Sequence, residues 1–205
     1  MVDPVGRSGG IVIWWMDAVN LQAIKHNRFS ITAVVSRDTQ QPWTLSIVYT
    51  STVDSTRAMQ WKYLEHRSQF WPGWWVLVGD FNDILYASKK SGGVSKQGWR
   101  LRNFNSLMAR CNSLDIGFKG YPFTWNNHRD GPANIQEMLD RALATQEWCS
   151  AFPHAKLSNL PVAGSDHHAL LLELHPLFSL TKRQFHFDAR WNLDNKYAKI
   201  IANNW

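Results

Sequence analysis

The feature that most constrains the fold is the ten-residue stretch WWVLVGDFND, which runs from Trp74 to Asp83. Its first half is continuously apolar, as is typical of a central strand covered on both faces. The stretch then ends abruptly in acidic and amide side chains, Asp80 and Asn82 among them. Side chains alternate along a strand, so these two point to the same side at its end. The stretch therefore predicts a buried strand that ends either in an Asx turn or in a functional site.

The segments around this strand predict a layered α/β or α+β domain. Six segments are rich in β-branched, aromatic or aliphatic residues, and the four earliest favour an antiparallel run. These predicted strands span residues 9–15, 20–26, 29–36, 43–50, 155–162 and 168–175. Apolar residues at helical intervals predict one helix that begins at Asp54 and ends before Pro72, and another from Trp99 to Leu114.

Size and composition indicate one globular domain with a substantial core. The chain has 205 residues, of which 44% are hydrophobic, and such a core explains its 12 Trp more simply than a function does. No run of 18 apolar residues predicts a membrane span, and the N-terminal sequence lacks the order of a signal peptide. Cys111 and Cys149 have no metal-ligand spacing and are too few for a disulfide framework. We therefore expect an intracellular protein with reduced thiols, no membrane contact and no disulfide-linked partner.

The formal net charge is +6 at pH 7, and part of it is concentrated in one segment. Between Asp83 and Asp115 there is no acidic residue and there are six basic ones: Lys89, Lys90, Lys96, Arg100, Arg102 and Arg110. This run is compatible with a solvated loop and helix face. It is equally compatible with a surface that contacts a phosphate backbone.

Two further polar groups interrupt apolar frames. Asp166 and His167 come just before the last predicted strand, where they form either a polar turn or a site. Asp is a ligand for hard cations, and neutral His is a candidate base. Asp140 lies within MLDRALA, where it pairs with Arg141, lies on a wet face, or holds an imidazole in the useful tautomer. None of these groups is specific alone, but their combination and order are.

Taken in order, the motifs VLVGDFND, GYPFTWNN, LDRALA and GSDH resemble the endonuclease/exonuclease/phosphatase superfamily. The resemblance is to the endonuclease-like domain of plant non-LTR (LINE-type) retrotransposons in particular, and it runs from about Gly6 to about His175. It implies a four-layered α/β sandwich of two packed β-sheets flanked by helices. It also implies a strand at MLDRALA, where local propensity favours a helix. The implied organisation is a partial domain at residues 1–176 and a helical, linker-like tail at residues 177–205.

The chemistry implied by the resemblance is phosphodiester or phosphomonoester cleavage that depends on Mg²⁺ (or Mn²⁺). Carried over by position, Asp80 orients or deprotonates the attacking water and Asn82 holds the scissile phosphate. Asp140 orients His167, which contacts the phosphate and transfers a proton, and Asp166 lies at the metal. A metal that neutralises developing charge and a His–Asp pair that handles protons make a coherent set.

Other positions follow from the same resemblance. Tyr49 matches a tyrosine that reaches the phosphate, and Trp125 lies at an aromatic wall. DNA is the implied partner, and the expected nucleic-acid-binding residues are Lys89, Lys90, Lys96, Arg100 and Trp125. The tail sequence FHFDARW resembles the segment that joins this domain to reverse transcriptase, so an ancestral fusion and a nuclear location are implied as well.

One expected ligand has no counterpart in the sequence. The superfamily begins with a strand that ends in Asn and a second strand that ends in Glu, its principal metal ligand, and the resemblance starts after both. Glu65 lies inside a predicted helix and is misplaced for that role. A Mg²⁺ site without this Glu is weak, so we expect a truncated copy, lacking the first two strands, with weak or no activity. The alternatives are a catalytically dead nucleic-acid-binding remnant and a phosphatase of the same superfamily.

Overall fold

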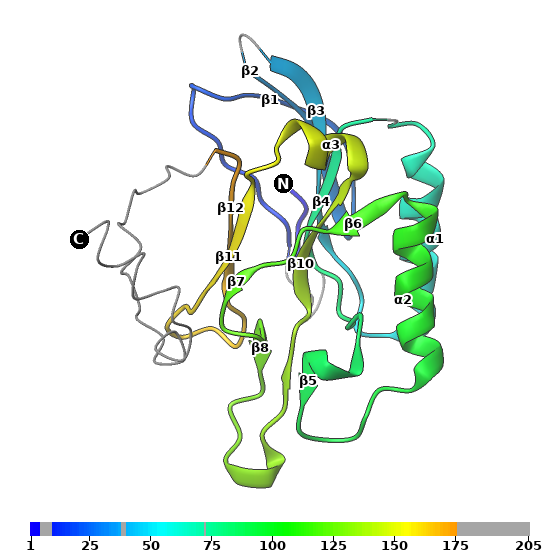
Figure 1. The fold of residues 1–205 in the computed structure, drawn as a ribbon, viewed down its shortest axis with the longest axis vertical. Helices are drawn as coiled ribbons and strands as arrows, with labels where there is room; N and C mark the ends of the chain where they lie inside the picture. The colour runs from blue at the N-terminus through cyan, green and yellow to red at the C-terminus, as the bar shows by residue number, and fades with distance from the viewer. Residues whose placement is uncertain (5–9, 38–39, 72, 176–205) are drawn as a thin grey trace, which may run out of the picture.

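The computed structural model describes residues 1–4, 10–37, 40–71 and 73–175, in which a large sheet carries helices on one face (Figure 1). This sheet has six strands in the order β1-β2-β3-β4-β10-β6. Their bounds are Asn20–Asn27 for β1, Ser30–Arg37 for β2, Gln40–Tyr49 for β3, Trp75–Asp80 for β4, Asp140–Thr145 for β10 and Ser113–Asp115 for β6. The first three strands pair in antiparallel fashion, as predicted for residues 20–26, 29–36 and 43–50.

The strand predicted at residues 9–15 is wrong for the part of it that the structure describes. Ile11 forms an isolated bridge with Val2, and no strand includes residues 12–15. Trp14 is 86% exposed and Trp15 53%. Strand propensity mainly reports how well a side chain fits a half-buried pleated surface, and here the segment has no ladder to join.

Two smaller sheets complete the strand inventory of the described residues. One has the order β12-β11-β7, with bounds Ala169–Glu173, Lys156–Leu160 and Lys119–Gly120. The other has the order β5-β9-β8, with bounds Lys90–Ser91, Gln136–Glu137 and Trp125–Asn126. Strands β11 and β12 pair in antiparallel fashion, which confirms the last two predicted strands.

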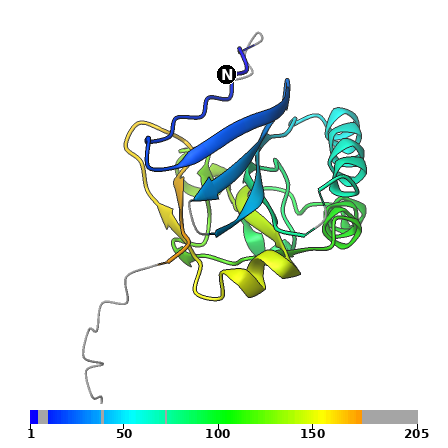
Figure 2. The same cartoon turned by 90° about the horizontal axis from the view of Figure 1, so that it is seen from above.

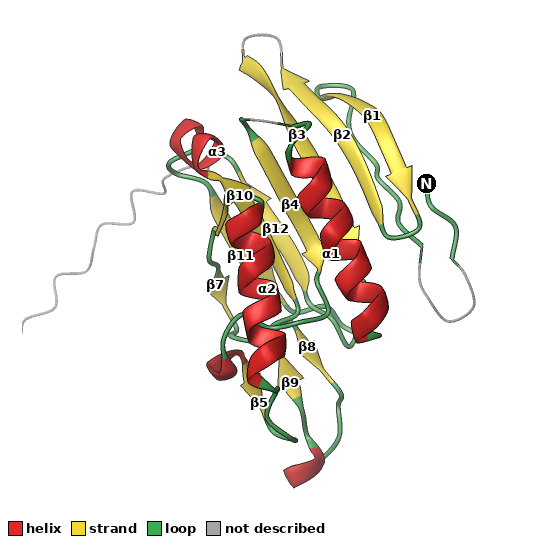
Figure 3. Cartoon of the chain, turned by 90° about the vertical axis from the view of Figure 1, so that its right-hand side faces the viewer, coloured by secondary structure: helices red, strands yellow, loops and turns green. Residues whose placement is uncertain are grey.

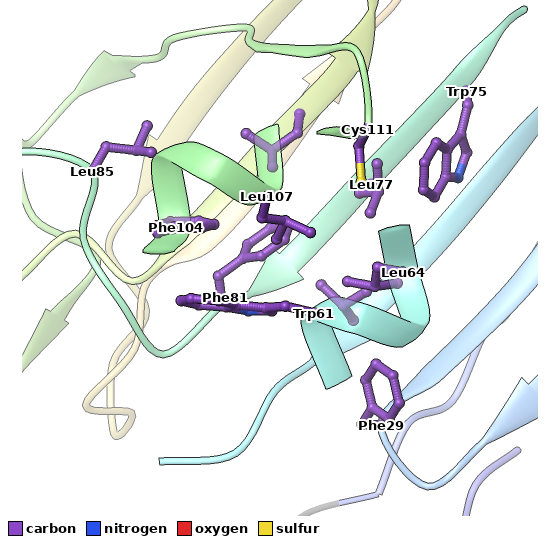
Figure 4. Packing of buried hydrophobic residues seen from close by; sticks show 12 residues of the cluster. Phe29, Trp61, Leu64, Trp75, Leu77, Phe81, Leu85, Phe104, Leu107 and Cys111 are labelled. Atoms are coloured by element: carbon purple, nitrogen blue, oxygen red, sulfur yellow. The ribbon is translucent and has the colours of Figure 1, made fainter. Parts of the chain in front are cut away.

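The main helices lie side by side on one face of the large sheet (Figure 3). Their bounds are Asp54–Ser68 for α1 and Gly98–Arg110 for α2, while a short α3 spans Gln146–Ala151 and single 3₁₀ turns occupy Ala87–Lys89 and Gly131–Ala133. The predicted apolar face of α2 is confirmed, because Phe104 and Leu107 are buried. Phe104 stacks on Trp61 of α1 with ring centroids 5.2 Å apart, and both cover Phe81 and Leu77 of the sheet side (Figure 4).

The opposite face of the large sheet packs against the β12-β11-β7 sheet (Figure 2). There Trp43, Val76 and Trp148 form a second core. Phe152, which follows α3, and Leu172, on β12, contribute to it. Neighbouring residues of β4 thus serve opposite cores, as expected of a strand covered on both faces. The predicted fold class is confirmed as a mixed α/β fold with several sheets flanked by helices.

The sequence MLDRALA forms a strand, as the resemblance implies and local propensity does not. All six residues of β10 are buried, and the strand pairs with β4 on one side and β6 on the other. Pairing on both edges outweighs the modest cost of placing good helix formers in a strand. The helical tendency appears only afterwards, in α3. The tail predicted at residues 177–205 lies outside the described residues.

Candidate active site

Three candidate residues lie in one row across three neighbouring strands. Strands β3 and β4 are parallel, so their carboxyl ends meet at one edge of the sheet, and β10 begins at that edge. Asp80 pairs in register with Tyr49 on one side and with Asp140 on the other. The preceding Gly79 has φ +139°, and a Cβ there would lie 2.0 Å from the Val48 carbonyl oxygen. Glycine is therefore required where β4 approaches β3 beside the site.

The turn after β4 is both an Asx turn and a part of the site. The Asn82 backbone N–H donates to Asp80 Oδ1 at 2.7 Å, which is the Asx turn considered from the sequence. The Asn82 side-chain amide donates to Asp80 Oδ2 at 2.8 Å and to the Thr50 carbonyl oxygen at 2.7 Å. Asn82 has φ +49°, in the left-handed region, which Asn tolerates better than most residues. Both oxygens of the Asp80 carboxylate are thereby fixed by one neighbour.

Asp140 holds His167 and does not pair with Arg141. His167 Nδ1 lies 2.9 Å from Asp140 Oδ2, whereas Arg141 donates to Asp115 Oδ2 at 2.8 Å. Of the alternatives for Asp140, the geometry thus selects the one in which a carboxylate orients an imidazole. This contact fixes Nδ1 and leaves Nε2 as the ring nitrogen available for other chemistry.

The loop that carries Asp166 and His167 is fastened to β8. Trp125 Nε1 donates to Asp166 Oδ2 at 3.0 Å, and the Asn126 backbone N–H donates to the Asp166 carbonyl oxygen at 3.0 Å. Trp125 and His167 also form an isolated backbone bridge. Asp166 itself is exposed. His168 turns the other way, where its Nδ1 lies 3.0 Å from Asn159 Oδ1.

Burial and neighbouring carboxylates shift the pKa of three groups in this cluster. Burial, followed by the charge of Asp140, raises the pKa of Asp80 to about 7. Burial and the charges of Asp80, Asp166 and Asp140 raise the pKa of Tyr49. Burial alone would lower the pKa of His167, but its hydrogen bond with Asp140 and the surrounding carboxylates outweigh burial and raise it.

The two carboxylates of this cluster suit a hard divalent cation. One ligand atom from each of Asp80, Asp140 and His167 lies within 4.8 Å of the others, and this group contains no glutamate from the described residues. Two carboxylates that repel each other strongly enough to raise a pKa provide a place where a cation is favoured. Asp166, to which the resemblance assigns the metal, is outside this group but close enough for its charge to act on Tyr49 and His167.

Two predicted DNA-binding lysines are held in buried ion pairs. Lys90 Nζ contacts Glu137, and Lys96 Nζ lies 2.9 Å from Glu137 Oε2 and 3.6 Å from Asp83 Oδ1. Both lysine side chains are 12% exposed. The acids that balance this basic run are therefore remote in sequence, and the two lysines contribute little free positive surface.

The remaining basic residues of the run divide into two groups. Two are paired across the helices, in Arg100–Asp54 and Arg110–Glu65. Within the part of the chain that the structure describes, Lys89 and Arg102 form no ion pair, and Lys89 Nζ lies 5.2 Å from the Phe118 ring centroid. Glu65 is thus engaged on the helical face, which agrees with its exclusion as a metal ligand.

Three residues of the site's support escaped sequence reasoning. Thr124 is fully buried, and its Oγ1 accepts the Leu139 and Asp140 backbone N–H groups, each at 2.9 Å. Arg57 and Asp83 form a buried ion pair beside the Asn82 turn. A polar residue between two aromatic ones, as Thr124 is in FTW, was the available signal, and Asp54 three residues before Arg57 was another.

Comparisons with known proteins support the fold. No protein-family model matches the sequence, and no curated protein is detectably similar to it. Among solved structures, the endonuclease domain of TRAS1, a telomere-specific non-LTR retrotransposon, is similar with a TM-score of 0.62 and 12% identity, covering 80% of this chain and 72% of that one. The 3′ phosphatase NExo from Neisseria, solved with a product DNA hairpin, has a TM-score of 0.53 and 16% identity, covering 77% and 70%.

These structures belong to the endonuclease/exonuclease/phosphatase superfamily, and this chain has their fold. At such low identity the likeness concerns the fold alone. None of the described helices combines the length and the apolar character that crossing a membrane requires.

Proposed function

We propose that this chain is a metal-dependent phosphodiesterase-type domain, a DNA endonuclease of retrotransposon origin. The observation that carries the proposal is the convergence of Asp80, Asp140 and His167 within 4.8 Å at one edge of the sheet. The same constellation of acid, amide and imidazole, expected from the order of four motifs, lies on a fold shared with a retrotransposon endonuclease domain.

The residues of the cluster suit a division of labour in hydrolysis. Asp80, with a pKa of about 7, is poised near neutrality to orient or deprotonate the attacking water. His167, held through Nδ1 by Asp140, presents Nε2 for proton transfer at the phosphate. A bound Mg²⁺ or Mn²⁺ would neutralise charge that develops on the phosphate, and Asp166 with the cluster carboxylates would hold it.

The Asn82 side chain binds Asp80 in the structure, and its contact with the phosphate is a proposed second role. Both of its amide N–H donors are already used, by Asp80 Oδ2 and by the Thr50 carbonyl oxygen. A contact from Asn82 to the scissile phosphate therefore requires one of these bonds to be exchanged when substrate binds. Tyr49, half-buried in the same row, is the other proposed phosphate contact.

We expect the activity to be weak, because the cluster contains no glutamate from the described residues and a Mg²⁺ site with few carboxylates binds poorly. At the limit, the chain is a remnant that binds nucleic acid without cleaving it. The phosphatase alternative is supported by the structural likeness to a 3′ phosphatase. Fusion to reverse transcriptase and a nuclear location remain part of the proposed origin.

Supercoiled-plasmid nicking in Mg²⁺ tests the proposal. The wild-type chain is compared with His167→Ala, with an EDTA control, and with His168→Ala as a matched variant whose imidazole contacts Asn159 and not the cluster. We expect nicking that is lost in His167→Ala and in EDTA and retained in His168→Ala. Absence of nicking by well-folded wild-type protein would leave the remnant.

A labelled oligonucleotide with a 3′-phosphate separates nuclease from phosphatase. A nuclease shortens the strand, whereas a phosphatase releases inorganic phosphate and leaves the strand length unchanged. Release of phosphate without shortening would replace the endonuclease proposal by the phosphatase one.

A further inference from the structure

A buried guanidinium lies beneath the turn that carries Asp80 and Asn82. The Arg57 side chain, on α1, is 4% exposed. Its Nη1 donates to the Ser51 carbonyl oxygen at 2.9 Å and to the Thr52 carbonyl oxygen at 3.0 Å. Its Nη2 contacts both Asp54 and Asp83 Oδ2, the latter at 3.1 Å. One planar fork thus serves four acceptors, a task for which a lysine ammonium is poorly shaped.

These contacts join the two loops that leave the site. Residues 50–53 follow β3, which ends in Tyr49, and residues 81–85 follow β4, which ends in Asp80. Arg57 binds the first loop through two carbonyl oxygens and the second through Asp83. The same two loops are also joined directly, because the Asn82 amide donates to the Thr50 carbonyl oxygen.

The fixed position of Asp83 determines where the Asn82 turn ends. Asp83 is 1% exposed, and its Oδ1 accepts the Ile84 backbone N–H at 2.9 Å. The residue before it, Asn82, has φ +49°, in the left-handed region, which Asn tolerates but which still costs more than the right-handed one. With Asp83 anchored on one side and the Asp80 carboxylate on the other, the turn has little freedom.

We propose that Arg57, acting through Asp83, is a positioning residue that keeps Asn82 in its left-handed turn and thereby aims the Asp80 carboxylate. The kinetic part of this inference rests on the proposed hydrolytic function, but the geometric part does not. The competing explanation is that the Arg57–Asp83 pair serves stability alone, as buried ion pairs do elsewhere.

The test exploits a difference between the two explanations. Removing one partner of a buried ion pair destabilises the fold, whereas replacing both with apolar residues of similar volume is often neutral. The variants are Arg57→Lys, Arg57→Met, Asp83→Leu and the double variant Arg57→Met/Asp83→Leu. Leu107→Ala, which removes core packing and none of the polar contacts of Arg57 or of the turn, is the control for loss of stability.

The first measurement is hydrogen exchange at the Asn82 backbone N–H, which donates to Asp80 in the wild type. If Arg57 is a positioning residue, exchange at Asn82 is about 10-fold faster in the double variant than in Leu107→Ala when the two variants are compared at the same free energy of unfolding. Arg57→Lys, which keeps the charge and loses the fork, shows the same acceleration. Unchanged Asn82 exchange in the double variant or, if that variant does not fold, in Arg57→Lys would overturn the inference.

The second measurement is the kinetics of nicking. A misplaced Asp80 lowers kcat about 10- to 100-fold and leaves KM within about twofold, whereas Leu107→Ala changes neither at a temperature where it is folded. An equal loss in Leu107→Ala would also overturn the inference. If the wild type does not nick at all, the proposed function fails, and the Asn82 exchange still decides the role of Arg57.

Discussion

The segments around the end of β4 and the start of β10 each carry two carboxylates three positions apart. In each segment one carboxylate is neutralised by basic side chains, whereas the other faces a second carboxylate. Asp83 follows Asp80 by three positions, and Glu137 precedes Asp140 by three. Asp83 and Glu137 are neutralised by Arg57, Lys90 and Lys96 in a continuous ion network. Asp80 and Asp140 face each other across β4 and β10, and among the described residues the one ion pair that this pair forms is that of Asp140 with His167.

The pKa values record the difference. Burial alone would raise the pKa of Glu137, but Lys90 and Lys96 outweigh burial and lower it. Burial and the charge of Asp140 raise the pKa of Asp80 to about 7, well above its usual range. The basic side chains thus neutralise Asp83 and Glu137, whereas the negative charge of Asp80 and Asp140 is not balanced in the same way. Unbalanced charge in an otherwise well-satisfied region indicates a place kept for a cation or for chemistry.

The largest effect is expected for Asp140→Asn, which removes one carboxylate of the Asp80–Asp140 pair. Loss of the carboxylate that orients His167 is expected to lower the nicking rate about 10²- to 10⁴-fold. Urea unfolding is expected to show a far smaller loss of stability than Glu137→Gln does. Retained nicking in Asp140→Asn would mean that the Asp140–His167 contact is structural.

Glu137→Gln targets the balanced pair. It leaves Lys90 and Lys96 largely buried without their shared partner, and we expect the free energy of unfolding to fall by about 2–4 kcal/mol. Urea denaturation at pH 7.5 measures this. Lys156→Gln, which removes an exposed ion pair with Glu173, is the control and should cost less than about 1 kcal/mol. Equal losses in the two variants would remove the distinction between scaffold and surface charge.

The pH dependence of the free energy of unfolding tests the raised pKa of Asp80. Its pKa is about 7 in the folded chain and near 3.8 when unfolded, so the folded state binds more protons between these values. Stability contributed by Asp80 therefore falls as pH rises from about 4 to about 7. We expect the stability of Asp80→Asn relative to the wild type to be about 2–4 kcal/mol more favourable at pH 8 than at pH 4. Parallel pH profiles for the two proteins would contradict the raised pKa.

The smallest effect is expected at the basic run. Lys89→Ala should weaken DNA binding about two- to fivefold and reduce the salt dependence by about one counterion. Lys96→Ala should act mainly through stability, because its ammonium lies between Asp83 and Glu137. Fluorescence anisotropy with labelled duplex at several salt concentrations measures the DNA affinity of both variants. A larger loss of affinity in folded Lys96→Ala than in Lys89→Ala would reverse this assignment.

Elements with a strong local signal and the antiparallel run of β1, β2 and β3 were predictable from the sequence, whereas the pairing of strands distant in sequence was not. The apolar run of β4, the apolar face of α2, and the strands β11 and β12 all have such signals. The failure at residues 10–15 and the helical propensity of MLDRALA share one cause. Strand formation depends on a partner that is distant in sequence. Strand β10 has two partner strands, whereas the described residues of the N-terminal segment have only the Val2–Ile11 bridge.

The candidate site divides along the same line. Asp80, Asn82, Asp140 and His167 were identified because four motifs occur in a specific order, and the structure brings all four together. The residues that support them were missed because each pair is remote in sequence. Asp83 meets Arg57 across 26 positions and Glu137 meets Lys90 across 47. Such contacts leave no local pattern in the sequence. The basic run between Asp83 and Asp115 was therefore compatible with a free positive surface, although Glu137 pairs with two of its lysines.

The unbalanced carboxylates can be tested directly by the paramagnetic broadening of NMR signals with Mn²⁺ at pH 7.5. If they form a cation site, the Asn82 side-chain and His167 imidazole signals broaden at Mn²⁺ concentrations that leave the Gln22 side-chain signal on β1 unchanged. The double variant Asp80→Asn/Asp166→Asn then abolishes this selectivity. Equal broadening of Asn82 and Gln22 in the wild type, or selective broadening that survives in the double variant, would contradict a cation site at this edge of the sheet.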